Sequence, residues 1–473
     1  MSQTITIDPV TRLEGHGKIT IHLDDQGEVR DAHFHVTQVR GFEKFSEGRP
    51  FYEMPSLMAR ICGICPVSHL IASAKACESI MSVRIPHTAA QLRRMLNLAQ
   101  TVQSHALSFF YLSSPDLLLG MESDPKTRHL FGVVAAKPEL GRAGIGLRRF
   151  GQHIIELLGN KRIHPGWVIP GGVTEPLAAA KRDEILRMIP EAYANIKLAF
   201  EWYKQIADEF QKEIEIFANF PSLYMGLINE DESVEFTDGA LRLIDGKGEV
   251  VADGITATQF TEVIGEAVES YSYTKFAYYK PLGYPEGSYR VGPLARLNIA
   301  KKMGTPLADA EFKEFKALAN GPVQSSFYYH LARLIDILHG IEKIEQILTD
   351  PLILDKHVRA TAGVNRLEGA GQAEAPRGTL NHHYKVDENG KITWANLIIA
   401  TGQNNNAMNQ GVLQAAKHYV KDGKFTEGIL NRVEAVVRTF DPCLSCSTHA
   451  FGQMPLALSL VSTNGVLIDQ IVR

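Results

Sequence analysis

Two pairs of cysteines have the spacing with the clearest chemical meaning in this chain. The stretch "RICGICPVSH" (60–69) carries Cys62 and Cys65, and "DPCLSCSTHA" (441–450) carries Cys443 and Cys446. Thiolates at positions i and i+3 can face the same way and bind one soft metal, but two sulfurs rarely complete a coordination sphere. The four thiols together are therefore a candidate metal site.

A site shared by both pairs must be closed by the fold, because residues 66 to 442 separate them. A local zinc ribbon brings its cysteine pairs together within about 15–20 residues. We therefore expect the N-terminal third and the C-terminal end of the chain to meet. The fifth cysteine, Cys77, has no partner of this kind and is expected to be a core residue.

Three kinds of site fit four thiols: a structural zinc or iron–sulfur site, two separate redox-active pairs, and a redox metal centre that performs chemistry. Spacing alone favours a structural metal. The surrounding residues favour a reactive centre, since several acids, bases and cations stand in segments marked by glycine or proline. These residues are Glu14, Arg60, His69, Arg377 and Asp441.

The composition is that of a globular protein. Of 473 residues, 45% are hydrophobic and 22% are charged, the formal net charge is −4 and the pI is about 6.5. This charge balance argues against a basic face for nucleic acid or anionic membranes. The N-terminus has no secretory pattern and the thiols are unpaired, so we expect a cytoplasmic protein. The longest stretch without charges, 442–468, is broken by glycine and proline and does not predict a membrane span.

Hydrophobic periodicity predicts an α+β protein with a mainly helical core and peripheral antiparallel sheets. Strands are expected near 5–7, 19–23 and 34–36, a small β-rich insertion over about 222–290, and a hairpin near 383–400. Helices are expected over 55–81, 88–112, 139–159, 177–218, 306–319, 324–349, 405–421 and 426–439. We expect one catalytic domain over 1–449, with 450–473 as a C-terminal extension.

Four stretches together resemble the catalytic large subunit of [NiFe] hydrogenases. They are "DPVTRLEGHGKI", "RICGICPVSH", "EAPRG" and "DPCLSCSTHA", and the resemblance runs from Asp8 to His449. Two more, "VRGFEKFSEGRP" and "IIATGQNNNAMNQGV", look most like the NAD-reducing bidirectional branch. The resemblance implies that family's fold and the reversible cleavage of H₂ into protons and electrons.

The resemblance also implies how the thiols are used. Cys62 and Cys443 match the terminal nickel ligands. Cys65 and Cys446 match the thiolates that bridge nickel to an iron carrying cyanide and carbon monoxide. Pro376 matches a residue in the wall of the same site. Soft, electron-rich thiolates stabilise nickel across oxidation states, which fits this assignment.

Catalytic roles are implied for an acid and a cation. Glu14 matches a glutamate that relays protons from the thiolate equivalent to Cys443, and Arg377 matches an arginine above the metals. Asp116 and Asp441 match the carboxylate partners of that arginine. Without the resemblance, Glu14 would be read as a solvated or capping residue, Arg377 as a loop residue and Asp116 as a helix cap.

Further residues match the surroundings of the metals in the family. His69 matches a hydrogen-bond donor to a bridging sulfur, although a satisfied core histidine is the alternative. Thr401 matches a hydroxyl that bonds a cyanide ligand, although it could equally be a strand-end residue. Glu43 and His449 match ligands of a structural magnesium, together with a backbone carbonyl around Leu397.

The chain lacks the motifs that would let it work alone. It has no Gly-x-Gly-x-x-Gly after a strand and no phosphate-binding loop, and Gly369 and Gly371 have the wrong continuation. It also has no spare cysteines for iron–sulfur clusters. We therefore expect no NAD, flavin or iron–sulfur cluster here. The expected partners are an iron–sulfur small hydrogenase subunit together with diaphorase subunits that bind flavin and NAD.

Several alternatives stay open at this stage. The chain could serve an NADP-linked, sulfur-reducing or F420-linked hydrogenase. A scaffold related to respiratory complex I, which binds quinone and no nickel, is disfavoured because its relatives lack the four-cysteine set. A structural zinc or iron–sulfur protein is the third alternative.

The last residues, 450–473, read as two apolar strand-like runs around Thr463-Asn464-Gly465. The resemblance implies that a maturation endopeptidase removes them after His449, once nickel-insertion factors have acted. The alternative is a permanent C-terminal hairpin packed on the core.

Overall fold

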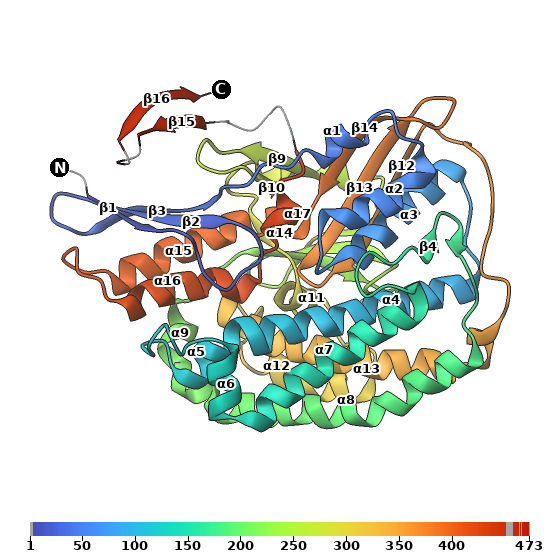
Figure 1. The fold of residues 1–473 in the computed structure, drawn as a ribbon, viewed down its shortest axis with the longest axis horizontal. Coiled ribbons are helices and arrows are strands. Elements are labelled where there is room, and N and C mark those ends of the chain that lie inside the picture. Colours follow the sequence, from blue (N-terminus) through green and yellow to red (C-terminus); the bar gives the residue numbers. More distant parts are fainter. Residues whose placement is uncertain (1–2, 451–456, 463, 465, 473) are drawn as a thin grey trace.

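The computed structural model describes residues 3–450, 457–462, 464 and 466–472, with a helical core and small, mostly antiparallel sheets at its edges (Figure 1). The expected α+β class is therefore confirmed. Within the described ranges, the helices fall short of the length and apolarity needed to cross a membrane.

The N-terminal sheet forms where apolar and polar residues alternate, as the sequence predicted. Its three antiparallel strands are β1 (Thr4–Ile7), β2 (Gly17–Leu23) and β3 (Val29–Val36). Ile19 and Ile21 are fully buried because alternate side chains of a strand point to the same face. The loop between β1 and β2 carries Glu14 away from this sheet toward the end of the chain.

Long amphipathic helices form the core of the molecule and lie along one another in the lower half of Figure 1. They are α4 (His87–Ala106), α7 (Pro138–Gly159), α8 (Ala179–Ile206) and α13 (Tyr329–Thr349). The predicted helix over 88–112 widens from Leu107 onward into a π-helical turn that precedes α5 (Ser114–Leu119). The predicted helix over 177–218 is interrupted after Ile206 and resumes as α9 (Gln211–Ile216).

The continuous helix predicted over 55–81 is wrong. The structure has a short α2 (Met54–Met58) and a longer α3 (Pro66–Met81), separated by a segment that holds Cys62 and Cys65. Proline at the first helical position starts α3, and the residue before a proline is disfavoured in the α conformation. The first thiol pair therefore lies in a non-helical turn that ends at the start of α3.

The strands expected between 222 and 290 are present. Four of them form a sheet in the order β11-β6-β7-β8, and two more form a hairpin. They are β6 (Leu223–Ile228), β7 (Ala240–Ile244), β8 (Val250–Ile255), β9 (Ile264–Val268), β10 (Lys275–Tyr279) and β11 (Tyr289–Arg290). After them come α11 (Pro293–Ile299) and the predicted α12 (Pro306–Lys316).

A three-stranded antiparallel sheet carries the arginine motif. Its strands are β12 (Glu368–Ala375), β13 (Gly378–Val386) and β14 (Ile392–Ile398). The hairpin expected near 383–400 corresponds to β13 and β14, but β12 was not predicted. Gly371 lets β12 lie directly against α3, because a Cβ there would come within 2.3 Å of the Ala72 carbonyl oxygen. Pro376 and Arg377 form the turn between β12 and β13.

The C-terminal segment returns to the N-terminal sheet. It contains α14 (Ala400–Gln403), α15 (Asn405–Tyr419), α16 (Glu427–Phe440) and α17 (Leu444–Ser447). A β-bridge joins Glu14 to Cys443, so the two ends of the chain meet as expected. The described part of the tail forms a hairpin of β15 (Ala457–Val461) and β16 (Leu467–Val472), while Thr463 and Gly465 of its predicted turn lie outside the described residues.

Candidate metal centre

The fold brings the four thiols of the two motifs into one buried cluster. The Sγ atoms of Cys62 and Cys443 lie 3.3 Å apart, and those of Cys65 and Cys446 lie 3.5 Å apart. Cys443 and Cys446 are separated by 3.0 Å, and all four sulfurs lie within 4.8 Å of one another. All four are free thiols. Cys77 is also buried, but it donates to the carbonyl of Phe51 and takes no part in the cluster.

Each thiol pair stands at the start of a helix. Cys65 is the N-cap of α3 and Cys443 is the N-cap of α17, so Cys446 lies in the first turn of α17 while Cys62 lies in the turn that precedes α3. Asp441, which ends α16, has φ +52°, a left-handed conformation that is rare for a residue with a side chain. This reversal turns the chain from α16 back toward the first thiol pair.

The four thiols share one space from which water is excluded, and their pKa values shift in different directions. Burial raises the pKa of Cys443 and of Cys446 well above the ordinary thiol value, since a low-dielectric interior disfavours the thiolate. Cys62 behaves in the opposite way: hydrogen bonding with Cys443, followed by the other two thiols, lowers its pKa well below that value. A bound cation would supply the charge that lets the remaining thiols ionise.

Arg377 is the buried cation beside the thiols. Its Nη2 lies 3.0 Å from Asp441 Oδ1, its Nε donates to the Asp441 carbonyl, and its Nη1 lies 3.3 Å from Ser104 Oγ. Burial opposes the charge, but the neighbouring Asp441, followed by Cys443, raises the pKa of Arg377 well above its ordinary value. The predicted pairing of Arg377 with Asp441 is present, and the guanidinium stays charged.

Glu14 connects the thiols with a less buried part of the molecule. The thiol of Cys443 lies 3.2 Å from Glu14 Oε2, and the backbone N–H of Ser445 donates to the same oxygen over 3.0 Å. The hydroxyl of Ser445 donates to Oε1, while Leu444 N donates to the backbone carbonyl of Glu14. A carboxylate held by three contacts from Cys443 and Ser445 is positioned to exchange a proton with Cys443.

A small cavity lies between the thiols and the arginine, and we call it the thiol cavity. Its walls include Cys65, His69, Arg377, Thr401, Cys443 and Cys446. Thr401 accepts a hydrogen bond from the N–H of Cys443 over 2.9 Å, which leaves its own hydroxyl proton available. Nδ1 of His69 lies 3.2 Å from Nε2 of His382, and burial lowers the pKa of His69 to about 4.

Asp116 lies apart from this cavity. Arg12 Nη2 approaches it at 2.5 Å, Arg438 Nε at 3.2 Å, and Asn431 Nδ2 donates to it over 3.0 Å. Burial alone would raise the pKa of Asp116, but Arg438 and Arg12 lower it. Among the described residues, no ion pair or hydrogen bond joins Asp116 to Arg377, so the structure does not bring these two predicted partners together.

Glu43 and His449, the predicted magnesium ligands, are neighbours. Glu43 stands on α1 (Phe42–Ser46), and its Oε1 lies 2.9 Å from Nδ1 of His449. Leu397 adjoins them, but it offers its N–H to Glu43 over 2.7 Å. Burial opposes ionisation of Glu43, and the charges of His449 and Lys275 outweigh it, so the pKa of Glu43 is lowered.

Three contact residues of the site were not singled out from the sequence. Ser445 stands inside the second thiol motif, so its position was a usable signal. Ser104 lies on a predicted amphipathic helix and His382 lies directly before the predicted hairpin, and neither has a local pattern that marks it. Their roles depend on tertiary contacts with Arg377 and His69.

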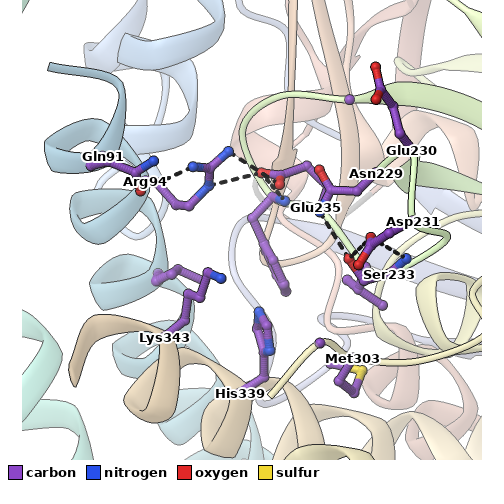
Figure 2. Close-up of a pocket in the computed structure, with 15 residues that line it drawn as sticks. Gln91, Arg94, Asn229, Glu230, Asp231, Ser233, Glu235, Met303, His339 and Lys343 are labelled. Carbon is purple, nitrogen blue, oxygen red and sulfur yellow. Dashed lines mark hydrogen bonds and ion pairs between the residues drawn. The ribbon is translucent and has the colours of Figure 1, made fainter. Parts of the chain in front are cut away.

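A larger pocket of about 530 Å³ opens between α4, α13 and the segment that follows β6, and we call it the Arg94 pocket (Figure 2). Its labelled walls include Gln91, Arg94, Asn229, Glu235, His339 and Lys343. Arg94 pairs with Glu235 at 3.2 Å and with Asp238 at 3.1 Å. Burial opposes the charge of Glu235, but Arg94 and nearby backbone N–H groups lower its pKa to about 2.

The two hollows differ in their capacity to hold a metal. Four thiol sulfurs converge in the thiol cavity, and soft thiolates suit nickel, iron and zinc. In the part of the chain that the structure describes, no other group of three or more histidine, cysteine or acidic side chains is placed to share an ion. The donor set of the thiol cavity therefore fits a nickel–iron centre.

Comparisons with known proteins agree with this donor set. Residues 40–126 and 228–449 match the family model described as "Nickel-dependent hydrogenase", and residues 4–39 match a model described as "HoxL-like". The chain is 41% identical to the beta subunit of the NAD-reducing hydrogenase HoxS of Cupriavidus necator, over 100% of both chains. It is 40% identical to one subunit of the F420-non-reducing hydrogenase vhc of Methanococcus voltae, over 98% of this chain and 99% of the relative.

A solved structure is similar over most of the chain. The crystal structure of an NAD⁺-reducing [NiFe]-hydrogenase in the H₂-reduced state has a TM-score of 0.92 and 43% identity, covering 94% of this chain and 99% of its own. Both the sequence and the fold thus agree with the four-thiol site. The chain belongs to the nickel-dependent hydrogenase family and is a catalytic large subunit of it.

Proposed function

We propose that the thiol cavity holds a nickel–iron centre at which H₂ is reversibly cleaved to two protons and two electrons. The observation that carries this proposal is the convergence of four free, buried sulfurs within 4.8 Å, from motifs at opposite ends of the chain. When bound, the metal pair supplies the cleavage of the H–H bond. The protein supplies ligands, a proton acceptor and a fixed positive charge.

The thiols divide into two roles in this proposal. Cys62 and Cys443 would hold nickel as terminal ligands, and Cys65 and Cys446 would hold nickel and iron together. The convergence of all four sulfurs within 4.8 Å supports a shared site, and the division of roles follows the resemblance of the two motifs to the family. Cyanide and carbon monoxide would complete the coordination of the iron, and the hydroxyl of Thr401 would donate a hydrogen bond to one of them.

Glu14 takes up the proton that Cys443 releases. The proton passes from Cys443 Sγ to Glu14 Oε2, which lies 3.2 Å away. From the carboxylate it can leave by the hydroxyl of Ser445, which contacts the other oxygen. Glu14 and Ser445 are less buried than the thiols, so this route leads away from the dry interior.

Arg377 acts as a fixed cation over the cavity, and Pro376, which precedes it in the turn, contributes to the wall of the same site in our proposal. Its planar guanidinium stays protonated and is held by Asp441, so it needs no reorganisation when charge develops beside it. His69 lies in the wall of the same cavity. We propose that it donates a hydrogen bond to one of the bridging sulfurs. Asp116 is proposed to act indirectly. Its ion pairs with Arg12 and Arg438 hold in place the two chain segments that lead to Glu14 and to Cys443.

A structural magnesium is proposed beside the centre, held by Glu43 and His449. Glu43 Oε1 is already engaged, and Oε2 has no hydrogen bond among the described residues and is the candidate ligand. Magnesium usually keeps several waters and needs few protein ligands, which is compatible with this small donor set.

Electrons leave this chain through partner subunits in our proposal. A small subunit with iron–sulfur clusters accepts them, and diaphorase subunits with flavin pass them to NAD. The HoxS relative, described as NAD-reducing, and the similar NAD⁺-reducing structure support this acceptor. The relatives at 40% identity are described as F420-non-reducing hydrogenases. An electron acceptor other than NAD is therefore the second candidate for this chain. NAD reduction uses the cytoplasmic nucleotide pool, so we place the complex in the cytoplasm.

The C-terminal extension, 450–473, is proposed to be removed after His449 by a maturation endopeptidase once nickel has been inserted. The match to the nickel-dependent hydrogenase model ends at residue 449. The similar crystal structure is covered over 99% of its chain by 94% of this one, which is compatible with a shorter mature subunit. Intact mass of the active subunit decides the question, because active protein that still carries Arg473 would refute removal.

Metal analysis of the complex, purified with its partners, tests the proposed function. We expect nickel, iron in excess of nickel because the partner subunits carry iron–sulfur clusters, and no zinc, together with H₂-dependent reduction of NAD. Zinc in place of nickel would contradict the hydrogenase function. Nickel with activity on an artificial acceptor, but none on NAD, would contradict only the acceptor.

A further inference from the structure

Arg296 lies behind the turn that carries Arg377. Its Nη1 donates to Glu374 Oε2 over 2.6 Å and to the carbonyl of Ala375 over 3.1 Å. Its Nη2 donates to the carbonyl of Pro376 over 3.3 Å. One guanidinium therefore contacts each of the three residues that precede Arg377, and two of these contacts are to backbone oxygens.

The helix that carries Arg296 also abuts Arg377 itself. Gly292, which precedes α11, has φ +94°, and a Cβ there would come within 2.6 Å of the Arg377 carbonyl oxygen. Only glycine combines this conformation with so close an approach. The start of α11 therefore packs directly against the backbone of Arg377.

The contacts close into a ring around Arg377. Nη2 of Arg296 lies 2.6 Å from Asp336 Oδ2, and the same oxygen lies 3.2 Å from Nε2 of His105. Ser104, the neighbour of His105 on α4, lies 3.3 Å from Nη1 of Arg377. The ring therefore supports the backbone of Arg377 from one side and its guanidinium from the other.

Stability alone does not explain this arrangement. The side chains of Arg296, Glu374 and Asp336 are fully buried, and taking three charges out of water costs more than well-packed apolar residues of similar volume would. Such a cluster is better explained by the geometry that it enforces. The planar fork of arginine can hold two carboxylates and two carbonyls at once, whereas a lysine ammonium cannot.

We propose that Arg296 is the positioning residue for Arg377. It touches neither the thiols nor the space between them. It fixes the carbonyls of Ala375 and Pro376, and through them the height of the Arg377 guanidinium above the thiol cavity. This inference rests on the proposed function of the thiol cavity, and it assigns to the Arg296 cluster a role in the geometry of that site.

Arg296→Lys tests the proposal in the purified, nickel-loaded complex. The charge remains, but the contacts to the two carbonyls are lost. We expect full nickel content and at least tenfold slower H₂ oxidation per nickel. We also expect a shift of the infrared band of the iron-bound carbon monoxide. Hydrogen–deuterium exchange should be faster in peptides covering 372–380.

Arg93→Lys is the matched control. Arg93 is equally buried, pairs with Glu78 over 3.0 Å, and donates to the carbonyls of Ile169 and Gly172 over 2.7 and 2.9 Å. The same substitution there removes the same kinds of contact from a segment without site residues. We expect the melting temperatures of Arg93→Lys and Arg296→Lys to fall by similar amounts, but turnover per nickel and the infrared band to stay unchanged in Arg93→Lys.

A second variant keeps the test decisive if Arg296→Lys fails to fold or to load nickel. Asp336→Asn keeps the shape of the side chain and removes one charge that holds the Arg296 fork, so a band shift in the same direction is expected. An unchanged band and unchanged turnover per nickel in the variant that loads nickel would overturn the proposal. Absence of carbonyl bands in the unmodified complex would instead refute the proposed function.

Discussion

The thiol cavity and the Arg94 pocket show that the size of a hollow does not locate the chemistry. The Arg94 pocket is large and open. The negative charge of its carboxylate Glu235 is already compensated by Arg94 and by backbone N–H groups. The thiol cavity is small and buried, yet four sulfurs, a guanidinium and the contact to Glu14 meet there. A dry site strengthens every electrostatic interaction inside it, so a few converging groups matter more than volume.

Removing one thiol from the cavity should have the largest effect. In Cys446→Ser the hydroxyl is a hard donor that does not ionise near neutral pH, so we expect loss of nickel and of all H₂-dependent activity. Cys77→Ser is the control, since that thiol is buried elsewhere and should leave the metals in place. Elemental analysis of both variants checks this, and normal nickel content in Cys446→Ser would contradict the shared thiol site.

Glu14→Gln should follow in magnitude. The amide keeps the shape of the side chain but cannot accept the proton of Cys443, and general acid–base groups contribute on the order of 100-fold or more. We expect nickel to remain while H₂/D₂ exchange falls by about that factor. Undiminished exchange would mean that protons leave the cavity by another route.

Arg377→Lys should have a smaller but still severe effect. The positive charge is kept, while the fork that joins Asp441 and Ser104 is lost, and mispositioned charge beside a reacting centre costs about 10- to 100-fold. We expect slower turnover with intact metals, measured as H₂ oxidation per nickel. Loss of nickel from this variant would instead give Arg377 a structural role.

Glu235→Gln, in the Arg94 pocket, should change stability and leave catalysis alone. The folded pKa of Glu235 is about 2, below its ordinary value of 4.5. Its ionisation therefore stabilises the protein by about 3 kcal/mol at neutral pH, and this contribution is lost as pH falls from 4.5 through 2. We expect the variant to melt lower at pH 7, and the difference from wild type to narrow toward acid pH.

Turnover per nickel in Glu235→Gln should equal that of the wild type. Scanning calorimetry between pH 7 and pH 3, with H₂ oxidation measured on the same samples, checks both parts. A tenfold loss of activity would contradict this prediction and show that the Arg94 pocket is coupled to the thiol cavity.

The sequence predicted the parts of the fold that depend on local pattern. The long helices α4, α7 and α13 carry apolar stripes, and the alternation in β2 and β3 marks a half-buried sheet. Hydrophobic periodicity wrongly predicted a helix at Cys62–Cys65, because the apolar residues around this turn continue the helical pattern. It also missed β12, whose glycines are buried against α3 and whose Glu374 is buried against Arg296.

The site was predictable to the extent that its residues stand in short motifs. The thiols, Glu14 and Arg377 do, and the structure places them together. Asp116 stands in a segment without a signature, and its place is set by Arg12 and Arg438 from other elements. Arg296 and Ser104 were missed for the same physical reason, since their meaning comes from contacts with residues far away in the chain.

Infrared absorption of the purified, nickel-loaded complex tests most directly whether the thiol cavity holds a nickel–iron centre. We predict bands in the cyanide and carbonyl stretching regions that shift when H₂ replaces argon and that are missing from Cys446→Ser. Silence in both regions from fully active, nickel-containing protein would contradict the assignment, as would unchanged bands in Cys446→Ser.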